Sequence, residues 1–146
     1  MRISRKAEYA LRALVAIARQ PRSWQIQELS TRENIPVKFL EQILLSLRHA
    51  GLLNSKRGVG GGYSLRKSPS EITLGEVIRI LDGPIALVPC AAEQQGEECT
   101  CPDRQNCAVR LMMTDIRRDL AAMLDTRTID DMLRLAPNAD ALAFEI

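Results

Sequence analysis

The chain has 146 residues, 46% of them hydrophobic, and its 20 Lys and Arg against 18 Asp and Glu give a formal net charge of +2. This hydrophobic fraction excludes intrinsic disorder, and the length fits one domain or a small head with an appended element. The charge is unevenly divided, because residues 1–67 hold 13 basic and 4 acidic side chains, whereas residues 68–146 hold 7 and 14. The basic first half therefore predicts an anionic partner.

The N-terminal segment carries no sign of export or membrane insertion. Its first residues are basic, but the apolar stretch that follows is interrupted by Glu8, Arg12 and Arg19, unlike the core of a signal peptide. No run approaches the roughly 20 apolar residues that a membrane helix needs. We therefore expect a cytoplasmic protein, in which thiols stay reduced and four clustered cysteines indicate metal or redox chemistry rather than disulfides.

Three helices are predicted in the first 50 residues. Apolar residues recur at helical spacing over residues 6–19, where Ser4 is a suitable N-cap. A short helix fits residues 26–33, and a third fits residues 36–50 after a turn. Gly51 follows the third helix at the position where a left-handed cap is common.

A hairpin is predicted next, with strands over residues 52–57 and 63–66 and a glycine-rich tip over residues 58–62. Its edges are basic, with Lys56, Arg57, Arg66 and Lys67. Helices separated by a tight turn and followed by a basic hairpin are typical of a winged helix-turn-helix. The glycines do not indicate a nucleotide-binding loop, because no Lys-Ser or Lys-Thr opening a helix follows them.

The second half is predicted to contain a helix over residues 74–81, a loop over residues 85–107, a long helix over residues 108–124 and a short one over residues 129–135. An amphipathic helix as long as the one over residues 108–124 usually packs into a protein core, but a head this small has little core to offer it. We therefore expect the long helix to pack against a second copy of the chain.

These elements predict a mainly α protein with three parts. Residues 1–83 would form a winged helix-turn-helix DNA-binding domain, residues 84–107 a cysteine-bearing loop, and residues 108–146 a dimerisation helix and C-terminal tail. The tail begins at Pro137.

A duplex DNA interface is predicted on the third helix and the hairpin. A basic face gains affinity for DNA through counterion release, and the N-terminal part of a recognition helix contacts base edges. Gln42 suits adenine, Glu41 suits the amino group of cytosine, and the glycines allow the hairpin backbone to approach DNA closely. The alternative is a solvated basic surface. The predicted contacts are Arg2, Lys38, Phe39, Glu41, Gln42, Lys56, Arg57, Gly60, Gly61 and Tyr63.

The four cysteines follow the pattern Cys90-x8-Cys99-x-Cys101-x5-Cys107. The pattern contains neither the short C-x2-4-C knuckle of most structural zinc sites nor the C-x-x-C of dithiol oxidoreductases. Soft thiolates on a loop still suit an iron–sulfur cluster or zinc. Four unligated loop thiols are the alternative.

Several segments together resemble the Rrf family of bacterial transcriptional regulators, specifically its iron–sulfur-cluster type, as in IscR, NsrR and RirA. The similarity runs over residues 1–135, and the hairpin motif is specific. The segments that carry it are 1–4, 9–12, 39–43, 57–63 and 72–78. The resemblance implies a homodimer joined through the long helix, which binds a palindromic operator and in many members holds a cluster that controls DNA affinity.

The resemblance also implies a ligand set for the cluster. The family's three cysteine positions are matched by Cys90, Cys101 and Cys107. Arg110 stands where IscR-like members have a ligating histidine, so the fourth ligand is either Glu8 of the partner subunit, which matches an acidic ligand of NsrR-like members, or Cys99. The cluster would be 2Fe–2S or 4Fe–4S.

The resulting hypothesis is a regulator whose cluster senses redox state, nitric oxide or iron supply. Ligation would order residues 88–107 between the long helix and the head, and cluster loss would shift the spacing of the two recognition helices. The alternative is a winged-helix regulator with structural zinc or no metal and no redox control. The sequence contains no nucleophile elbow or histidine–carboxylate pair that would indicate an enzyme.

Overall fold

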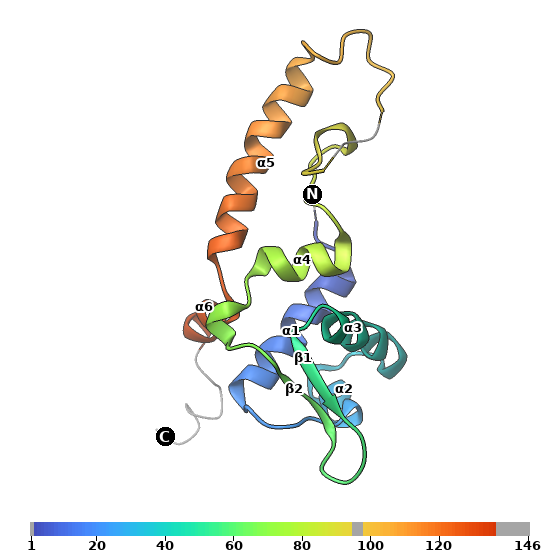
Figure 1. Cartoon of the computed structure of the whole chain (residues 1–146), viewed down its shortest axis with the longest axis vertical. Helices are drawn as coiled ribbons and strands as arrows, with labels where there is room; N and C mark the ends of the chain where they lie inside the picture. The colour runs from blue at the N-terminus through green and yellow to red at the C-terminus, as the bar shows by residue number, and fades with distance from the viewer. Residues whose placement is uncertain (1, 95–97, 137–146) are drawn as a thin grey trace.

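The computed structural model describes residues 2–94 and 98–136, so the predicted tail from Pro137 lies outside the described residues. A helical head occupies one end of the molecule, and a two-stranded hairpin extends from it. The long helix α5 rises away from the opposite side of the head (Figure 1). The hairpin and the free end of α5 therefore lie at opposite ends of the molecule.

Three helices build most of the head: α1 (Arg5–Arg19), α2 (Ile26–Glu33) and α3 (Val37–His49). Ser4 caps α1 as predicted, because its hydroxyl accepts a hydrogen bond from the Ala7 backbone N–H at 3.0 Å. The helix α3 is one residue shorter at each end than predicted, since Pro36 has extended backbone and serves as the N-cap. Gly51 adopts the expected left-handed conformation, with φ of +84°.

The core of the head is formed by the apolar faces of these helices. Their 3.6-residue periodicity places the same sides inward that the sequence predicts. Trp24, in the connection between α1 and α2, is also buried, and its indole N–H donates to the Gln20 carbonyl at 3.0 Å. The fully enclosed side chains include Leu14, Ile17, Leu29, Leu40, Ile43, Leu44 and Leu47.

The hairpin, or wing, consists of the antiparallel strands β1 (Leu53–Lys56) and β2 (Gly62–Leu65). Leu53 pairs with Leu65 at the base of the wing, and both strands differ from the predicted ranges by about one residue at each end. Backbone hydrogen bonds of 2.8 and 2.7 Å also join Tyr63 to Trp24. This extra pairing, which the sequence did not predict, attaches the wing to the core of the head.

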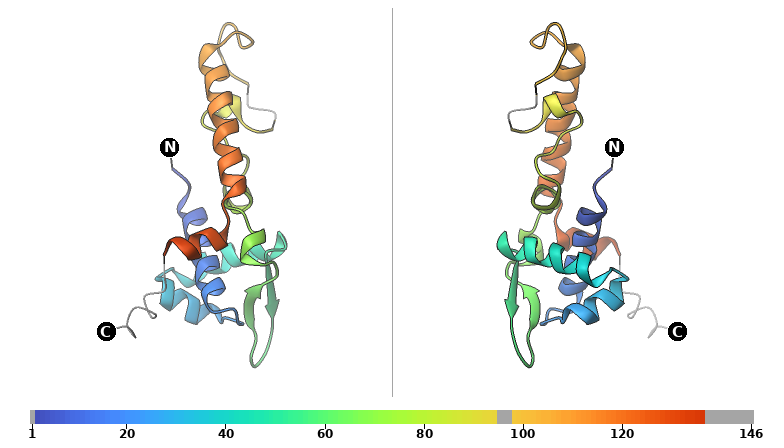
Figure 2. Two further views of the ribbon diagram at one scale, coloured as in Figure 1. Left: turned by 90° about the vertical axis from the view of Figure 1, so that its left-hand side faces the viewer. Right: turned by 90° about the vertical axis from the view of Figure 1, so that its right-hand side faces the viewer.

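The remaining elements connect the head to α5. Helix α4 (Leu74–Asp82) is capped by Thr73 as expected, and α5 (Ala108–Thr126) extends two residues beyond its predicted end. Short 3-10 turns, η1 (Pro69–Glu71) and η2 (Pro89–Ala91), occur where only loop was expected. Figure 2 shows α5 standing nearly upright above the head in both side views.

Helix α6 (Ile129–Leu135) matches its predicted range and returns to the head. Ile129 is fully buried in the head core, and its backbone N–H donates to the Ile72 carbonyl at 3.0 Å. The core of the head therefore includes residues that precede α5 in the sequence and residues that follow it. None of the helices in the described ranges has the length and apolar character that crossing a membrane requires.

Candidate nucleic-acid interface and cysteine loop

The solvent-facing side of α3 carries three of the predicted contact residues. Lys38, Glu41 and Gln42 are exposed within the first two turns of α3, whereas Leu40 and Ile43 are buried. The buried side fixes the helix against the head, so the three polar side chains extend outward from a rigid support. This arrangement suits the reading of base edges in a major groove.

Phe39 and Tyr63, two other predicted contacts, are half-buried and take part in packing. The Phe39 ring lies 5.6 Å from that of Tyr9 in an edge-to-face arrangement, which fastens the start of α3 to α1. Tyr63 lies in β2, where its backbone pairs with Trp24. Phe39 and Tyr63 therefore help to fix the positions of α3 and the wing, on which the predicted DNA contacts lie.

The tip of the wing is a tight turn. The Gly61 backbone N–H donates to the Gly58 carbonyl at 3.0 Å, and Gly60 has φ of +76°. A Cβ at Gly61 would collide with the Lys56 carbonyl, so this position has no room for a side chain. Lys56 and Arg57, both exposed, flank the turn. A bare backbone between basic side chains is suited to approach the phosphates of DNA.

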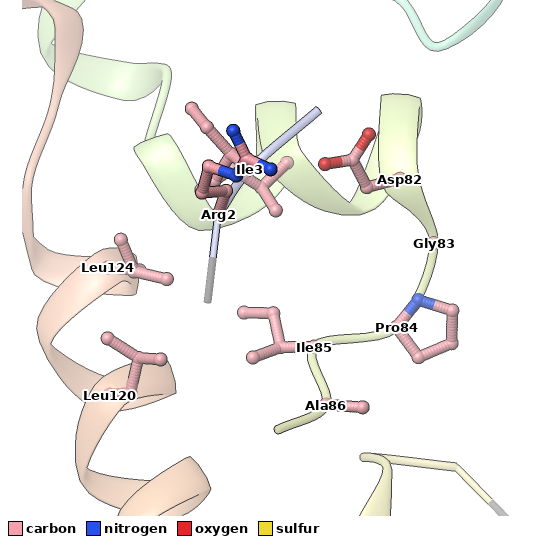
Figure 3. Close-up of a pocket in the computed structure, with 10 residues that line it drawn as sticks. Arg2, Ile3, Asp82, Gly83, Pro84, Ile85, Ala86, Leu120 and Leu124 are labelled. Atoms are coloured by element: carbon pink, nitrogen blue, oxygen red, sulfur yellow. The ribbon is translucent and has the colours of Figure 1, made fainter. Parts of the chain in front are cut away.

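Arg2 lies elsewhere. It borders a pocket of about 290 Å³ between the N-terminal segment, the end of α4 and α5, together with Asp82, Ile85, Leu120 and Leu124 (Figure 3). The N-terminus is at the far side of the head from the wing tip (Figure 1). The structure thus separates Arg2 from the predicted contacts on the wing.

Three of the four cysteines lie near one another at the start of α5. Cys107 is the N-cap of α5, and Cys101 is exposed. Hydrogen bonding and negative charge from the neighbouring Cys99, followed by Cys107, raise the pKa of Cys101. The Cys101 backbone N–H hydrogen-bonds the Cys99 sulfur and lowers the pKa of Cys99. Cys99, Cys101 and Cys107 therefore form a group of interacting thiols.

Cys90 lies in η2, which packs beside α5 at a different height from residues 98–107 (Figure 1). Glu8 is half-exposed on α1 and forms an ion pair with Arg5 at 3.2 Å. Within residues 2–94 and 98–136, no three Cys, His, Asp or Glu side chains are gathered in a geometry that could hold a metal ion. The thiol chemistry fits a soft metal or an iron–sulfur cluster, but the arrangement of this single chain does not assemble the complete predicted ligand set.

An ion-pair junction that the sequence did not reveal joins the cysteine loop to the head and to α5. Arg79 of α4 contacts Glu93 of the loop at 2.6 Å and Asp125 of α5 at 2.6 Å. The hydrogen bonds from Arg79, and to a smaller extent the one from the Ile85 backbone N–H, lower the pKa of the Glu93 carboxyl. The partners are 14 and 46 residues from Arg79, so no local spacing could have indicated the junction.

Helix α5 leaves much of its apolar stripe uncovered. Met112, Ile116 and Met123 are 58%, 43% and 57% exposed, and Val109 and Leu111 are exposed as well. Within α5 only Ala121 is buried. Exposed apolar side chains in such a row are typical of a helix that packs against another chain.

The short helices α2 and α3, the wing and the packed core define a winged helix-turn-helix protein with a long additional helix. A family model described as Rrf2, iron-dependent transcriptional regulator, matches residues 3–135. The chain belongs to the Rrf2 family of transcriptional regulators, as the sequence resemblance implied.

Curated relatives agree with this assignment. The chain is 39% identical over 137 residues to a putative HTH-type transcriptional regulator of Rhodobacter capsulatus named rrf2-like, covering 90% of this chain and 91% of that protein. It is 32% identical over 136 residues to the HTH-type regulator CymR of Bacillus subtilis, covering 90% and 89%. It is 33% identical over 135 residues to IscR of Pectobacterium atrosepticum, covering 91% and 79%. These relatives are named as regulators of transcription, and the chain is not an enzyme.

Solved structures confirm the predicted fold class. The structure of CymR, described as the global cysteine regulator of B. subtilis, superposes with a TM-score of 0.75 at 30% identity, covering 93% of this chain and 98% of that one. IscR of T. potens has the same fold, with a TM-score of 0.71 at 24% identity over all of this chain and 92% of that one. The mainly α fold with a winged head and a long C-terminal helix is thus confirmed.

Proposed function

We propose that this protein is a homodimeric regulator that binds a palindromic site in duplex DNA through α3 and the wing, under the control of its cysteine loop. The observation that carries the DNA-binding part is the exposed polar side of α3, together with a tight glycine turn in the wing that Lys56 and Arg57 flank. Lys38 adds positive charge at the start of α3. Relatives with HTH-type names support the same conclusion.

Selection of duplexes from a random-sequence pool by the full-length protein tests this part. We expect enriched duplexes with two-fold symmetry and half-sites about one helical turn apart, because each subunit of a dimer presents one recognition helix. Binding should weaken steeply as salt is raised. Failure to enrich any duplex would contradict DNA binding, and enrichment of single, asymmetric sites would contradict the dimer.

The exposed stripe on α5 supports the proposed dimer. A helix with Met112, Ile116 and Met123 open to solvent gains stability when a second copy covers them. Light scattering on the full-length protein should give twice the chain mass of 16.3 kDa. A monomer at all concentrations would overturn this proposal.

For the cysteine loop we propose an iron–sulfur cluster held by Cys90, Cys101 and Cys107. The fourth ligand would be Cys99 of the same loop or Glu8 of the partner subunit. The soft thiolates suit iron, the family description is iron-dependent, and an IscR relative aligns over most of the chain. When bound, the cluster would supply a centre whose oxidation or loss changes how the loop is ordered, in response to redox state, nitric oxide or iron supply.

Two observations favour the alternative, a regulator with structural zinc or no metal. In the described part of the chain no three possible metal ligands are gathered together. In addition CymR, which is described as a cysteine regulator, aligns with this chain as well as IscR does. Anaerobic purification followed by iron, sulfide and zinc analysis separates the two. Coloured protein with stoichiometric iron and acid-labile sulfide supports the cluster, whereas colourless protein with zinc or without metal supports the alternative.

A further inference from the structure

The head is joined to α5 where the start of α4 meets the last turn of α5. A Cβ at Gly75 would collide with the Asp125 carboxylate, so the two helices approach this closely because residue 75 has no side chain. The Leu74 backbone N–H also donates to the Arg127 carbonyl at 2.9 Å. These contacts fix the C-terminal end of α5 to the head.

Apolar packing along the rest of this junction is sparse. Among the described residues, the cluster between α4 and α5 has three buried members, Ile78, Ile85 and Ala121. A pocket of about 290 Å³ opens beside them, and Leu120 and Leu124 of α5 line it (Figure 3). Because protein interiors are normally close-packed, a junction with an open pocket is only weakly fixed in its angle by apolar contacts.

Arg79 supplies the polar part of the junction. Its Nη1 and Nη2 atoms donate to the two carboxylate oxygens of Asp125 at 2.6 and 3.0 Å, and its Nε and Nη2 atoms donate to Glu93 at 2.6 to 3.2 Å. The Glu93 side chain is only 17% exposed, and its carboxylate also accepts from the Ile85 backbone N–H at 2.9 Å. A planar guanidinium held by two carboxylates has a fixed orientation, so Arg79 fixes the direction in which α5 leaves α4.

The angle at this junction determines how the two heads of the proposed dimer are placed. The dimer would be held by the exposed stripe of α5, and the head joins α5 at the C-terminal end of a helix of 19 residues, about 28 Å long. A change of this angle moves the two recognition helices relative to each other. Half-sites lie roughly 34 Å apart and base pairs about 3.4 Å apart, so a displacement of a few ångström changes the favoured spacing by about one base pair.

We propose that Arg79 is a specificity-determining residue, which sets the distance between the two half-sites that the dimer accepts. It acts as a positioning residue, through the angle between α4 and α5, and not through contact with DNA. This inference rests on the proposed function, because half-site spacing has a meaning only for a dimer on two-fold symmetric DNA.

Fluorescence anisotropy with the full chain and a series of labelled duplexes tests the inference. The parent probe is a duplex enriched by the wild-type protein from a random pool. Two further probes have one base pair inserted or removed between the half-sites, and a fourth keeps one half-site only. Each spacing change should weaken wild-type binding at least roughly tenfold, because the two heads no longer meet both half-sites together.

Two variants should lose this preference. Arg79→Gln removes the bidentate bond to Asp125, and the loss caused by a spacing change should fall to about threefold or less. Gly75→Ala keeps every charge and favours the helix, but its Cβ displaces the Asp125 carboxylate, so the same result is expected. Both variants should bind the single half-site as wild type does, since the head itself is unchanged.

The matched control is Arg134→Gln. Arg134 pairs with Asp130 within α6 at 2.8 Å, so this substitution removes the same charge and an ion pair without touching the junction. The control should keep the wild-type dependence on spacing. If Arg134→Gln loses it as Arg79→Gln does, the effect is one of charge and the inference is wrong.

The other outcomes separate this inference from the function on which it rests. If wild type enriches no duplex, DNA binding itself fails and the inference falls with it. If wild type binds all spacings equally well, or if Arg79→Gln and Gly75→Ala both keep the wild-type preference, Arg79 does not set the spacing while DNA binding stands. A weaker affinity of both variants for the single half-site, with the spacing preference retained, would show that the junction supports the head and not its placement.

Discussion

The head and α5 differ in how far their apolar side chains are buried. The head encloses most of its leucines and isoleucines in one core built from α1 to α4, the wing base and α6. Along α5 only Ala121 is buried, in a small cluster with Ile78 and Ile85, while a row of methionines and branched residues stays open. The head therefore encloses its core within one chain, whereas the apolar side chains of α5 would be covered only in the proposed dimer.

The two regions also differ in what they hold. The head presents basic and polar side chains on a rigid support, whereas residues 84–126 carry the four thiols and seven acidic against four basic residues. Arg79 and its two carboxylate partners form a direct connection between them. Regulation would require such a connection, because a sensor that moves independently of the head cannot change its affinity.

The largest expected effect is on the core of the head. Leu44→Ala removes a fully buried side chain and should lower the free energy of unfolding by about 2 to 5 kcal/mol. The next residue, Leu45, is 42% exposed, and Leu45→Ala should change it by only about 0.5 kcal/mol. Urea titration followed by circular dichroism measures both. Similar losses in the two variants would show that the core is not arranged as described.

A charge on α5 should instead break the dimer. Ile116→Asp places a carboxylate on the open stripe and should weaken self-association by at least about 2 kcal/mol, roughly thirtyfold. Sedimentation equilibrium measures the change. Arg118→Gln, at an exposed position of the same helix, serves as the control and should leave the mass unchanged. If Ile116→Asp remains a dimer, another surface joins the subunits.

Removing a basic side chain from the wing should affect DNA affinity alone. Arg57→Ala should weaken binding to all duplexes and reduce the slope of log K against log salt by about 1. Fluorescence anisotropy across a salt series gives the slope. Arg134→Ala, on α6, removes the same charge away from the wing and should leave the salt slope unchanged. An unchanged slope for Arg57→Ala would mean that the wing is not at the DNA.

The smallest expected effect is the pH dependence of the Arg79 junction. The pKa of Glu93 is lowered from its ordinary value of 4.5, so its contribution to stability is present above that pH and is lost as the pH falls through the folded-state pKa. The difference in Tm between wild type and Glu93→Gln should therefore shrink below about pH 4.5. A constant difference across the acid range would show that the ionised carboxylate is not responsible.

Much of the fold could be predicted because it depends on local rules. Helical periodicity, the Ser4 and Thr73 caps and the glycines after α3 and in the wing gave element bounds within about two residues. The family could be predicted from short sequence motifs, and the family model confirms it. The pairing of Trp24 with Tyr63 could not be predicted, because it joins residues far apart in the chain and leaves no periodic signal.

The features of the candidate site likewise fall into those that local sequence predicts and those that only the tertiary fold sets. The exposure of Lys38, Glu41 and Gln42 follows from which side of α3 is apolar. In contrast, the separation of Cys90 from the other thiols and the partners of Glu93 depend on where the loop folds back. The contact residues and cluster ligands remain predictions, to be tested by the experiments above.

The sequence alone determined the elements of this protein, their order and the regulator family, because these depend on residue type, spacing and short motifs. It also divided the charge into a basic front and an acidic back. Only the tertiary structure decided that α6 completes the head core, that α5 stays uncovered, and that one arginine joins loop, head and helix. The physical reason is that burial and ion pairing depend on distances in space, which chain folding sets and sequence separation does not.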